Sequence, residues 1–403
     1  MVTLHGAPQQ QHRGEVKMGT TGEEICQQSV TEILDIVHRL GPEFATMIWG
    51  PPGIGKTEAV KQVFGKIDAK TGKPEHEIVL VLAGCSEPTD ISGVPFEYKY
   101  KDEFVATQIL APIWAYNASK DAPPEHQGPM VIFFDDIVTG HEQTQAACFK
   151  VFGEKKVGNL QLRDNVYIIA AGNRTEDKSA AFEMPMALAN RMKHYYAKTD
   201  VDAWLDWAVD AGIHPLITAF IRRQPQNLNT FAEVVKLAQS EKAFATPRTW
   251  EMMSKSMYKM DPNGGIQGNW LYKAAVGCIG SGIGIEFTAY CNNTTKLIAP
   301  EEIIRDPANA PIPPKTEVDV LYATISALEH HINQEDNWHK WDKALQYVLR
   351  PELESEFGLL IAKMATIIAL SKLDEKDRVK AAKNPYFKEM YKEYGSYLSN
   401  SGA

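Results

Sequence analysis

The sequence predicts an α/β fold, in which a parallel sheet flanked by helices is followed by a small all-helical lid and a C-terminal helical segment. Two observations predict this fold. The first part of the chain contains short apolar runs without polar alternation, which are typical of strands buried on both faces of a parallel sheet. Beyond about residue 198, the apolar residues instead recur at helical spacing.

Each expected element follows from its local pattern. An amphipathic helix precedes the first strand and stops at Gly41-Pro42, and its apolar stripe consists of Val30, Ile33, Leu34 and Val37. The expected strands are the apolar runs 44–49, 78–82, 130–134 and 166–171, and residues 193–197 are expected to form a fifth strand. Prolines crowd the segment that follows the lid, where they fix backbone angles and remove N–H donors, so we expect little regular structure there.

These patterns divide the chain into five parts. Gln-rich and Gly-rich residues at the N-terminus cannot bury enough apolar surface to offset the cost of ordering them, which predicts a disordered tail. The expected parts are the tail 1–22, an α/β nucleotide-binding domain 23–198, a helical lid 199–295, a Pro-rich linker 296–315 and a C-terminal helical segment 316–403.

Composition narrows the class of protein. The 42 basic and 51 acidic side chains give a net charge of −9, so no global field attracts nucleic acid or an anionic membrane. The five cysteines are widely spaced and form no C-x-x-C pair, which indicates neither a disulfide framework nor a zinc site. No apolar run is long enough to span a bilayer, and the N-terminus does not resemble a secretory signal. We expect a cytoplasmic protein that does not associate with a membrane.

The strongest motif is a glycine-rich loop between an expected strand and an expected helix. It matches G-x-x-x-x-G-K-[ST], the P-loop or Walker A pattern. The glycines allow backbone amides to converge on phosphate oxygens, the lysine would neutralise β- and γ-phosphates, and the threonine hydroxyl would ligate Mg²⁺. The expected nucleotide-binding residues are Gly50, Pro51, Pro52, Gly53, Ile54, Gly55, Lys56, Thr57 and Glu58.

Two carboxylates end the expected strand 130–134, at the edge where an open α/β sheet places its ligand chemistry. The segment resembles a Walker B strand. Asp135 would hold the metal, and Asp136 would orient or deprotonate the attacking water. Since the usual second residue is Glu, the shorter Asp136 leaves slow or partner-dependent hydrolysis open.

Together these motifs resemble the AAA+ superfamily and, within it, the MoxR-like group of the AAA_5 type, over about residues 30 to 295. The resemblance implies three further functional residues. Asn173 would be the sensor 1 residue that touches the γ-phosphate or the lytic water, and Arg191 would be an arginine finger that reaches a neighbour's nucleotide. Arg248 would be the sensor 2 residue of the lid.

Two inserts carry the likeness to the MoxR-like group. The segment from Asp90 to Trp114 resembles the helix 2 insert, and residues 155–162 resemble the hairpin that precedes sensor 1. The first insert contains the aromatic and basic residues Tyr98, Tyr100, Lys101 and Phe104. They either face a central pore and hold a substrate there, or belong to an ordinary hairpin surface.

The resemblance implies an ATPase that uses ATP and Mg²⁺, assembles as a homo-oligomer, expected to be a hexameric ring, and remodels or activates a partner protein as a MoxR-like chaperone. A von Willebrand factor A domain protein is the expected type of partner. Two other functions stay open. One is a nucleic-acid-directed motor or a GTPase of the restriction type, which would need a local basic lining. The other is an assembly subunit in which bound nucleotide holds a ring together with weak hydrolysis.

Overall fold

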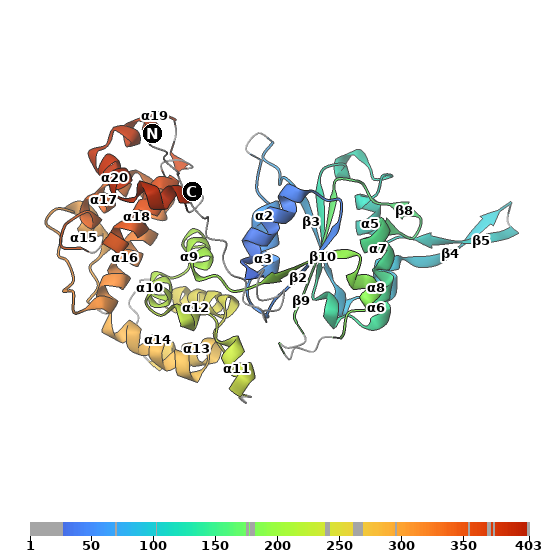
Figure 1. Cartoon of the computed structure of the whole chain (residues 1–403), viewed down its shortest axis with the longest axis horizontal. Helices are drawn as coiled ribbons and strands as arrows, with labels where there is room; N and C mark the ends of the chain where they lie inside the picture. The colour runs from blue at the N-terminus through green and yellow to red at the C-terminus, as the bar shows by residue number, and fades with distance from the viewer. Residues whose placement is uncertain are drawn as a thin grey trace, which may run out of the picture. The chain divides into compact units, whose positions relative to one another are not determined.

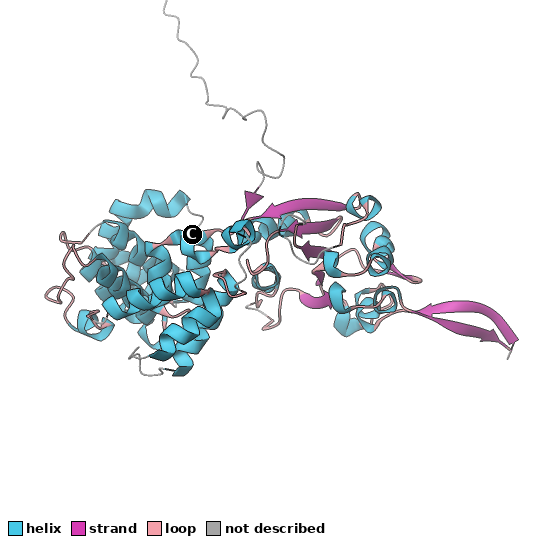
Figure 2. Ribbon diagram, turned by 90° about the horizontal axis from the view of Figure 1, so that it is seen from below, coloured by secondary structure: helices cyan, strands magenta, loops and turns pink. Residues whose placement is uncertain are grey.

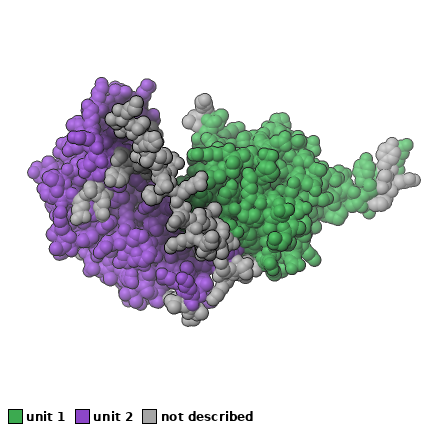
Figure 3. Space-filling model, viewed as in Figure 1, with its two compact units in different colours: residues 1–50, 60–172, 182–198 green, residues 51–59, 173–181, 199–403 purple. Residues whose placement is uncertain are grey.

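The computed structural model describes residues 27–68, 71–101, 103–174, 177, 182–237, 242–260, 269–294, 296–353, 355–368, 372–373 and 375–400. The expected tail, residues 1–22, lies outside this part of the chain. The chain forms two compact units (Figure 3). Unit 1 comprises residues 1–50, 60–172 and 182–198, and unit 2 comprises residues 51–59, 173–181 and 199–403.

Unit 1 is built on a six-stranded sheet whose strands all run parallel. In order across the sheet they are β1 (Gln27–Gln28), β10 (Met192–Ala197), β2 (Ala45–Trp49), β9 (Val166–Gly172), β6 (Met130–Asp135) and β3 (Glu77–Leu82). Every residue of β9 is buried, as the absence of polar alternation in its sequence predicts. The α/β fold with a parallel sheet is therefore confirmed, and β1 is an additional short strand that its Gln-Gln sequence does not predict.

Helices flank this sheet, with α2 and α3 on one side and α5 to α8 on the other (Figure 1). The expected first helix begins after Ser29, whose side chain accepts from the Glu32 amide while the Glu32 carboxylate accepts from the Ser29 amide. It ends at Gly41. The helices of this unit are α2 (Val30–Leu40), α4 (Pro88–Ser92), α5 (Ile113–Ala118), α6 (Glu142–Ala147), α7 (Phe149–Glu154) and α8 (Met186–Ala189). Helix α3 (Lys56–Phe64) begins in unit 2 and belongs to unit 1 from Val60 on.

Two antiparallel hairpins interrupt the α/β pattern where the inserts were expected. The longer one, β4 (Val94–Tyr100) with β5 (Glu103–Leu110), extends away from the rest of unit 1 (Figures 1 and 2). Tyr98 and Lys101 are exposed on it, whereas the side chains of Tyr100 and Phe104 lie outside the described residues. The shorter one joins β7 (Lys156–Val157) to β8 (Leu160–Gln161).

Unit 2 is helical in its described residues, apart from turns and loops. Its first group of helices is α9 (Val201–Asp210), α10 (Pro215–Arg223), α11 (Phe231–Leu237), α12 (Pro247–Met260), α13 (Asn269–Ile279) and α14 (Ser281–Asn293). Its second group is α15 (Pro300–Arg305), α16 (Val318–Asn333), α17 (Trp341–Val348), α18 (Ser355–Ile367), α19 (Glu375–Lys383) and α20 (Pro385–Asn400). Nowhere in the described chain does a helix combine the length and apolar character that crossing a bilayer demands.

Helix α16 joins the two helical groups of unit 2. Leu321 and Ile325 belong to the apolar core of the C-terminal helices, whereas Ala323 is buried in the core formed by α9 to α14. A buried ion pair connects the same two groups, since Arg222 of α10 lies 2.7 Å from the Glu329 carboxylate of α16. Burial raises the pKa of Glu329, and Arg222 opposes that rise.

Helix α15 corrects the expectation of an irregular linker. It lies within residues 296–315, and Pro300 stands at its N-terminal end. The proline ring is compatible with the first turn of a helix because the N–H that it lacks has no partner within the helix. One proline of this segment, Pro300, therefore begins a short helix instead of preventing regular structure.

An aromatic cluster fills the space between α2, α3 and the sheet. The rings of His38, Phe64, His76 and Tyr167 pack against one another with centroids 5.1 to 6.2 Å apart. Burial lowers the pKa of His76 below its usual 6.5, and neighbouring His38 lowers it further, while Glu75 opposes the shift. The buried Nδ1 of His76 accepts no hydrogen bond within the described residues.

This cluster predicts acid sensitivity of unit 1. Since the pKa of His76 is lower in the folded state, the unfolded chain binds more protons below about pH 6.5, and stability falls as the pH decreases through that range. We expect the urea midpoint to fall between about pH 7.5 and about pH 5.5, and to fall less in His76→Phe, which keeps an aromatic ring and cannot titrate. An equal fall in both proteins would contradict this role of His76.

Candidate functional site

The carboxyl ends of three neighbouring strands of unit 1 meet at one edge of the sheet. Trp49 at the end of β2 pairs with Gly172 at the end of β9, and the Gly50 N–H donates to the Gly172 carbonyl at 3.1 Å. Asp135 ends β6, the next strand across the sheet. The phosphate loop, Asn173 and the paired carboxylates therefore all leave the sheet from the same edge, as the motif order predicts.

The backbone at Asp136 has a conformation that suits an aspartate. Its φ of 49° and ψ of 45° lie in the left-handed region, which short polar residues such as Asp and Asn tolerate best after Gly. The Asp136 N–H donates to the Asp135 carboxylate at 3.1 Å, and Thr139 donates to the Asp136 carbonyl at 2.8 Å. A glutamate here would lack the short side chain that eases this conformation.

The glycine-rich loop has the backbone that its sequence predicts. Gly53 and Gly55 have φ values of 78° and 92°, which L-residues other than Gly rarely adopt. Helix α3 begins directly at Lys56. The loop therefore ends at a helix N-terminus, where backbone amides and the helix dipole favour a bound anion.

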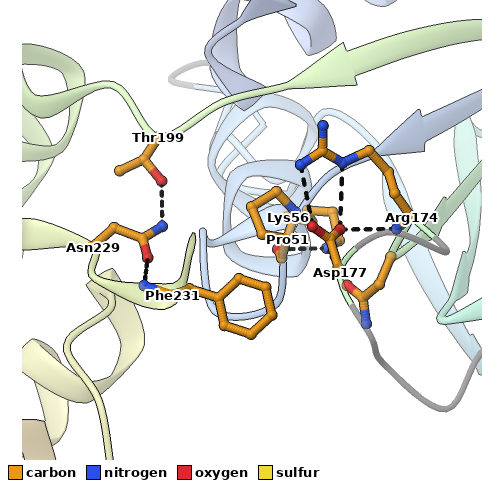
Figure 4. Close-up of polar contacts among 8 residues, drawn as sticks. Pro51, Lys56, Arg174, Asp177, Thr199, Asn229 and Phe231 are labelled. Atoms are coloured by element: carbon orange, nitrogen blue, oxygen red, sulfur yellow. Dashed lines mark hydrogen bonds and ion pairs between the residues drawn. The ribbon is translucent and has the colours of Figure 1, made fainter. Parts of the chain in front are cut away.

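The Lys56 ammonium is already held at the loop by two oxygens. Its Nζ donates to the Pro51 carbonyl and to the Asn173 side-chain oxygen, each at 3.0 Å, and Figure 4 shows the lysine beside Pro51. Both Lys56 and Asn173 are only 8% exposed. Two residues selected by separate motifs are thus joined directly, and the cation is directed into the loop.

An ion pair next to Asn173 was not identified from the sequence. The Asp177 carboxylate accepts from the Arg174 guanidinium at 3.1 Å and from the Arg174 backbone N–H at 2.9 Å (Figure 4). Asp177 is 7% exposed, so this contact is shielded from water. The only sequence signal is an Arg and an Asp three residues apart, which is common on any surface turn. The pair fixes the backbone that carries Asn173.

The start of lid helix α12 contacts the phosphate loop within unit 2. The Arg248 N–H donates to the Gly53 carbonyl at 3.2 Å. Thr246 precedes the helix, and its hydroxyl accepts from the Thr249 N–H at 3.2 Å, while the Thr249 hydroxyl accepts from the Thr246 N–H at 2.8 Å. Because Pro247 has no N–H, every donor of the first turn is satisfied, one of them by the loop itself.

Gly53 is required here for space as well as for conformation. A Cβ at this position would lie 2.9 Å from Oγ1 and 3.2 Å from Cγ2 of Thr246. At Gly55 a Cβ would meet nothing within 4 Å. Thr246 can therefore approach the loop closely only because residue 53 has no side chain.

Arg191 belongs to a different cluster of unit 1. It is exposed, and its guanidinium donates to the Ala187 carbonyl and lies 5.4 Å from the centroid of the Phe149 ring. A Cβ at Gly153 would lie 2.8 Å from Arg191 Nε, so the side chain rests against a glycine. Contacts within unit 1 thus hold Arg191 on the surface, in the turn between α8 and β10.

Comparisons with known proteins give only distant likenesses. No protein-family model matches the chain, and no curated protein matches its sequence. Among solved structures, a Cytophaga hutchinsonii protein described as an ATPase has a TM-score of 0.30 and 14% identity, covering 58% of this chain and 76% of its own. NtrX from Brucella abortus has a TM-score of 0.34 and 13% identity, covering 86% and 69%.

Hsp104, solved with ATPγS and casein, has a TM-score of 0.33 and 14% identity, covering 57% of this chain and 42% of its own. At these TM-scores the likenesses transfer no activity, partner or assembly to this chain. The chemistry of the site must therefore be inferred from its own residues.

The two loop glycines make distinguishable predictions. Gly55→Ala incurs the cost of a left-handed alanine, about 1–2 kcal/mol, whereas Gly53→Ala incurs that cost and also displaces Thr246. We expect Gly53→Ala to lower the urea midpoint of unit 2 by more than Gly55→Ala does. Gly53→Ala combined with Thr246→Ser should recover only the part of the difference that comes from the methyl contact at 3.2 Å, because serine keeps the closer hydroxyl oxygen and Cβ. Equal losses in the two glycine variants would show that Thr246 does not depend on Gly53.

Proposed function

We propose that this protein is a Mg²⁺-dependent ATPase of the AAA+ class, an oligomeric motor of MoxR-like type that remodels or activates a partner protein. The observation that carries the proposal is the buried Lys56 ammonium. Lys56 is the first residue of helix α3 and follows two glycines with left-handed backbone angles. Hydrogen bonds to Pro51 and Asn173 direct its ammonium group into the loop. This is the arrangement that phosphoryl oxygens of a nucleoside triphosphate require.

Nucleotide binding would exchange the contacts of Lys56. Phosphate oxygens replace the neutral Pro51 carbonyl and the Asn173 amide oxygen as acceptors, giving stronger, charge-assisted hydrogen bonds. The exchange also releases the Asn173 side chain, which can then contact the γ-phosphate or the attacking water. The Arg174–Asp177 ion pair keeps the Asn173 backbone in place during this change.

The residues available for a cation are hard oxygen donors, as Mg²⁺ prefers. The Thr57 hydroxyl and the Asp135 carboxylate would hold it, directly or through water. Held there, the cation would supply positive charge that offsets the charge developing on the phosphates. Asp136, fixed by its left-handed backbone and its N–H to Asp135, orients or deprotonates the attacking water.

Two arginines complete the proposed mechanism. Arg248 at the start of α12 extends from the backbone amide that contacts Gly53 and would sense the phosphates of its own subunit. Arg191 is exposed and would stabilise the γ-phosphoryl charge of a neighbour, which makes a homo-oligomer, proposed as a hexameric ring, part of the mechanism. A von Willebrand factor A domain protein is the proposed type of partner.

An assembly subunit with weak hydrolysis is the second candidate function. The shorter carboxylate of Asp136 favours it, since the side chain reaches less far than a glutamate and its backbone conformation disfavours glutamate. In that function, bound nucleotide would stabilise a ring without being turned over rapidly.

Lys56→Ala tests the proposal directly. Removing the ammonium deletes its charge-assisted hydrogen bonds to the phosphates, so we expect affinity for Mg·ATP to fall on the order of 10- to 100-fold and turnover to be lost. Lys61→Ala, which removes an exposed lysine from the same helix, is the matched control and should retain both properties. Calorimetry and phosphate release measure the two effects. Unchanged ATP binding in Lys56→Ala would overturn the proposed function.

Asp136→Asn separates the motor from the assembly subunit. Asparagine has the same size and tolerates the same left-handed backbone, so the fold and nucleotide binding should be retained. Without the carboxylate we expect turnover to decrease by about 100-fold or more. If turnover by the wild type is already slow and does not change in Asp136→Asn, the chain acts as a nucleotide-bound assembly subunit.

A further inference from the structure

A chain of hydrogen bonds in unit 1 connects the strand before the phosphate loop to the segment that carries Arg191. Trp49 ends β2, and its indole N–H donates to His194 Nδ1 at 2.9 Å. The two rings also stack, with centroids 6.1 Å apart. The other nitrogen of His194, Nε2, lies 2.8 Å from the Ala189 carbonyl. None of these contacts has a role in the proposed catalytic steps.

The partners of His194 indicate which of its ring nitrogens carries a proton. An indole N–H can only donate, so Nδ1 must be the unprotonated nitrogen that accepts from Trp49. A carbonyl can only accept, so Nε2 must carry the proton and donate to Ala189. The two ring nitrogens of His194 therefore each serve one partner. No other side chain at this position fills both roles with a rigid ring.

Ala189 is the last residue of α8, two positions before Arg191. Carbonyls in the last turn of a helix lack partners within the helix and need donors from elsewhere. The Ala187 carbonyl receives the Arg191 guanidinium, and the Ala189 carbonyl receives His194. Because α8 has only four residues, such outside contacts determine its position more than its own hydrogen bonds do.

We propose that His194 is a positioning residue for Arg191. By joining the Ala189 carbonyl to Trp49, it fixes the end of α8 to strand β2 and so sets where the arginine is offered to a neighbouring subunit. This inference rests on the proposed function, in which Arg191 acts on the nucleotide of the neighbour. His194 itself contacts no nucleotide in this proposal and is not a catalytic residue.

Oligomers mixed from two variants test whether the nucleotide site of one subunit is completed by Arg191 of its neighbour. Lys56→Ala subunits lack a working nucleotide site and still offer Arg191, so they act as finger donors. Arg191→Ala subunits lack the finger and keep their own site, so they act as acceptors. Each variant alone should be inactive, and Arg191→Ala should still bind Mg·ATP. Mixing the two should restore phosphate release because some interfaces then contain both halves.

His194→Phe is then introduced into one partner at a time. In the donor, we expect phosphate release by the mixture to fall on the order of 10- to 100-fold, the range that a small misplacement of a catalytic group causes. In the acceptor, whose own finger is already absent, we expect no decrease. His194→Gln in the donor should restore part of the activity, since its amide can accept from Trp49 and donate to Ala189. Release is normalised to the co-assembled fraction, measured with differently tagged subunits.

The outcomes distinguish the two levels of the proposal. If the mixture without any His194 change stays inactive, Arg191 does not act between subunits, and the shared site and the role of His194 both fail. If that mixture is active and His194→Phe lowers activity equally in either partner, only in the acceptor, or in neither, the positioning role alone is overturned. Loss of co-assembly by the donor would make His194 a structural residue and would also overturn it.

Discussion

The hydrogen bond from the Gly50 N–H to the Gly172 carbonyl is the constraint on which the site depends. It extends the pairing of β2 with β9 by one step beyond the last regular pair of the sheet. From this point one strand continues into the phosphate loop and the other into Asn173. The contact between Lys56 and Asn173, 117 residues apart in the chain, follows from that shared origin. The sheet thus determines where the phosphate loop and the segment that carries Asn173 begin.

The parts of the fold that could be predicted from sequence are those with a local signal. The apolar runs that form β2, β6 and β9 can be recognised without knowing their partner strands, because burial on both faces leaves a continuous apolar stretch. The loop motif is equally local, since Gly53, Gly55 and Lys56 must be close in sequence to surround one phosphate. By contrast, β1 has only backbone pairing and no apolar pattern.

The residues that sequence reasoning missed act through partners far away in the chain. His194 has a role only because Trp49 and Ala189 lie on either side of it, and Thr246 only because residue 53 is a glycine. Asp177 has a partner nearby, yet an acid three residues after an arginine is too common to stand out. The left-handed backbone of Asp136 also lacks a sequence signal.

Helix α16 makes the two helical groups of unit 2 dependent on each other. Its residues alternate between two apolar cores, and its Glu329 provides the counter-charge for the buried Arg222 of α10. A chain ending before α16 would leave that guanidinium buried without its acid and would uncover the apolar faces of the lid. The C-terminal helices are therefore an integral part of the packing that stabilises the first helical group of unit 2.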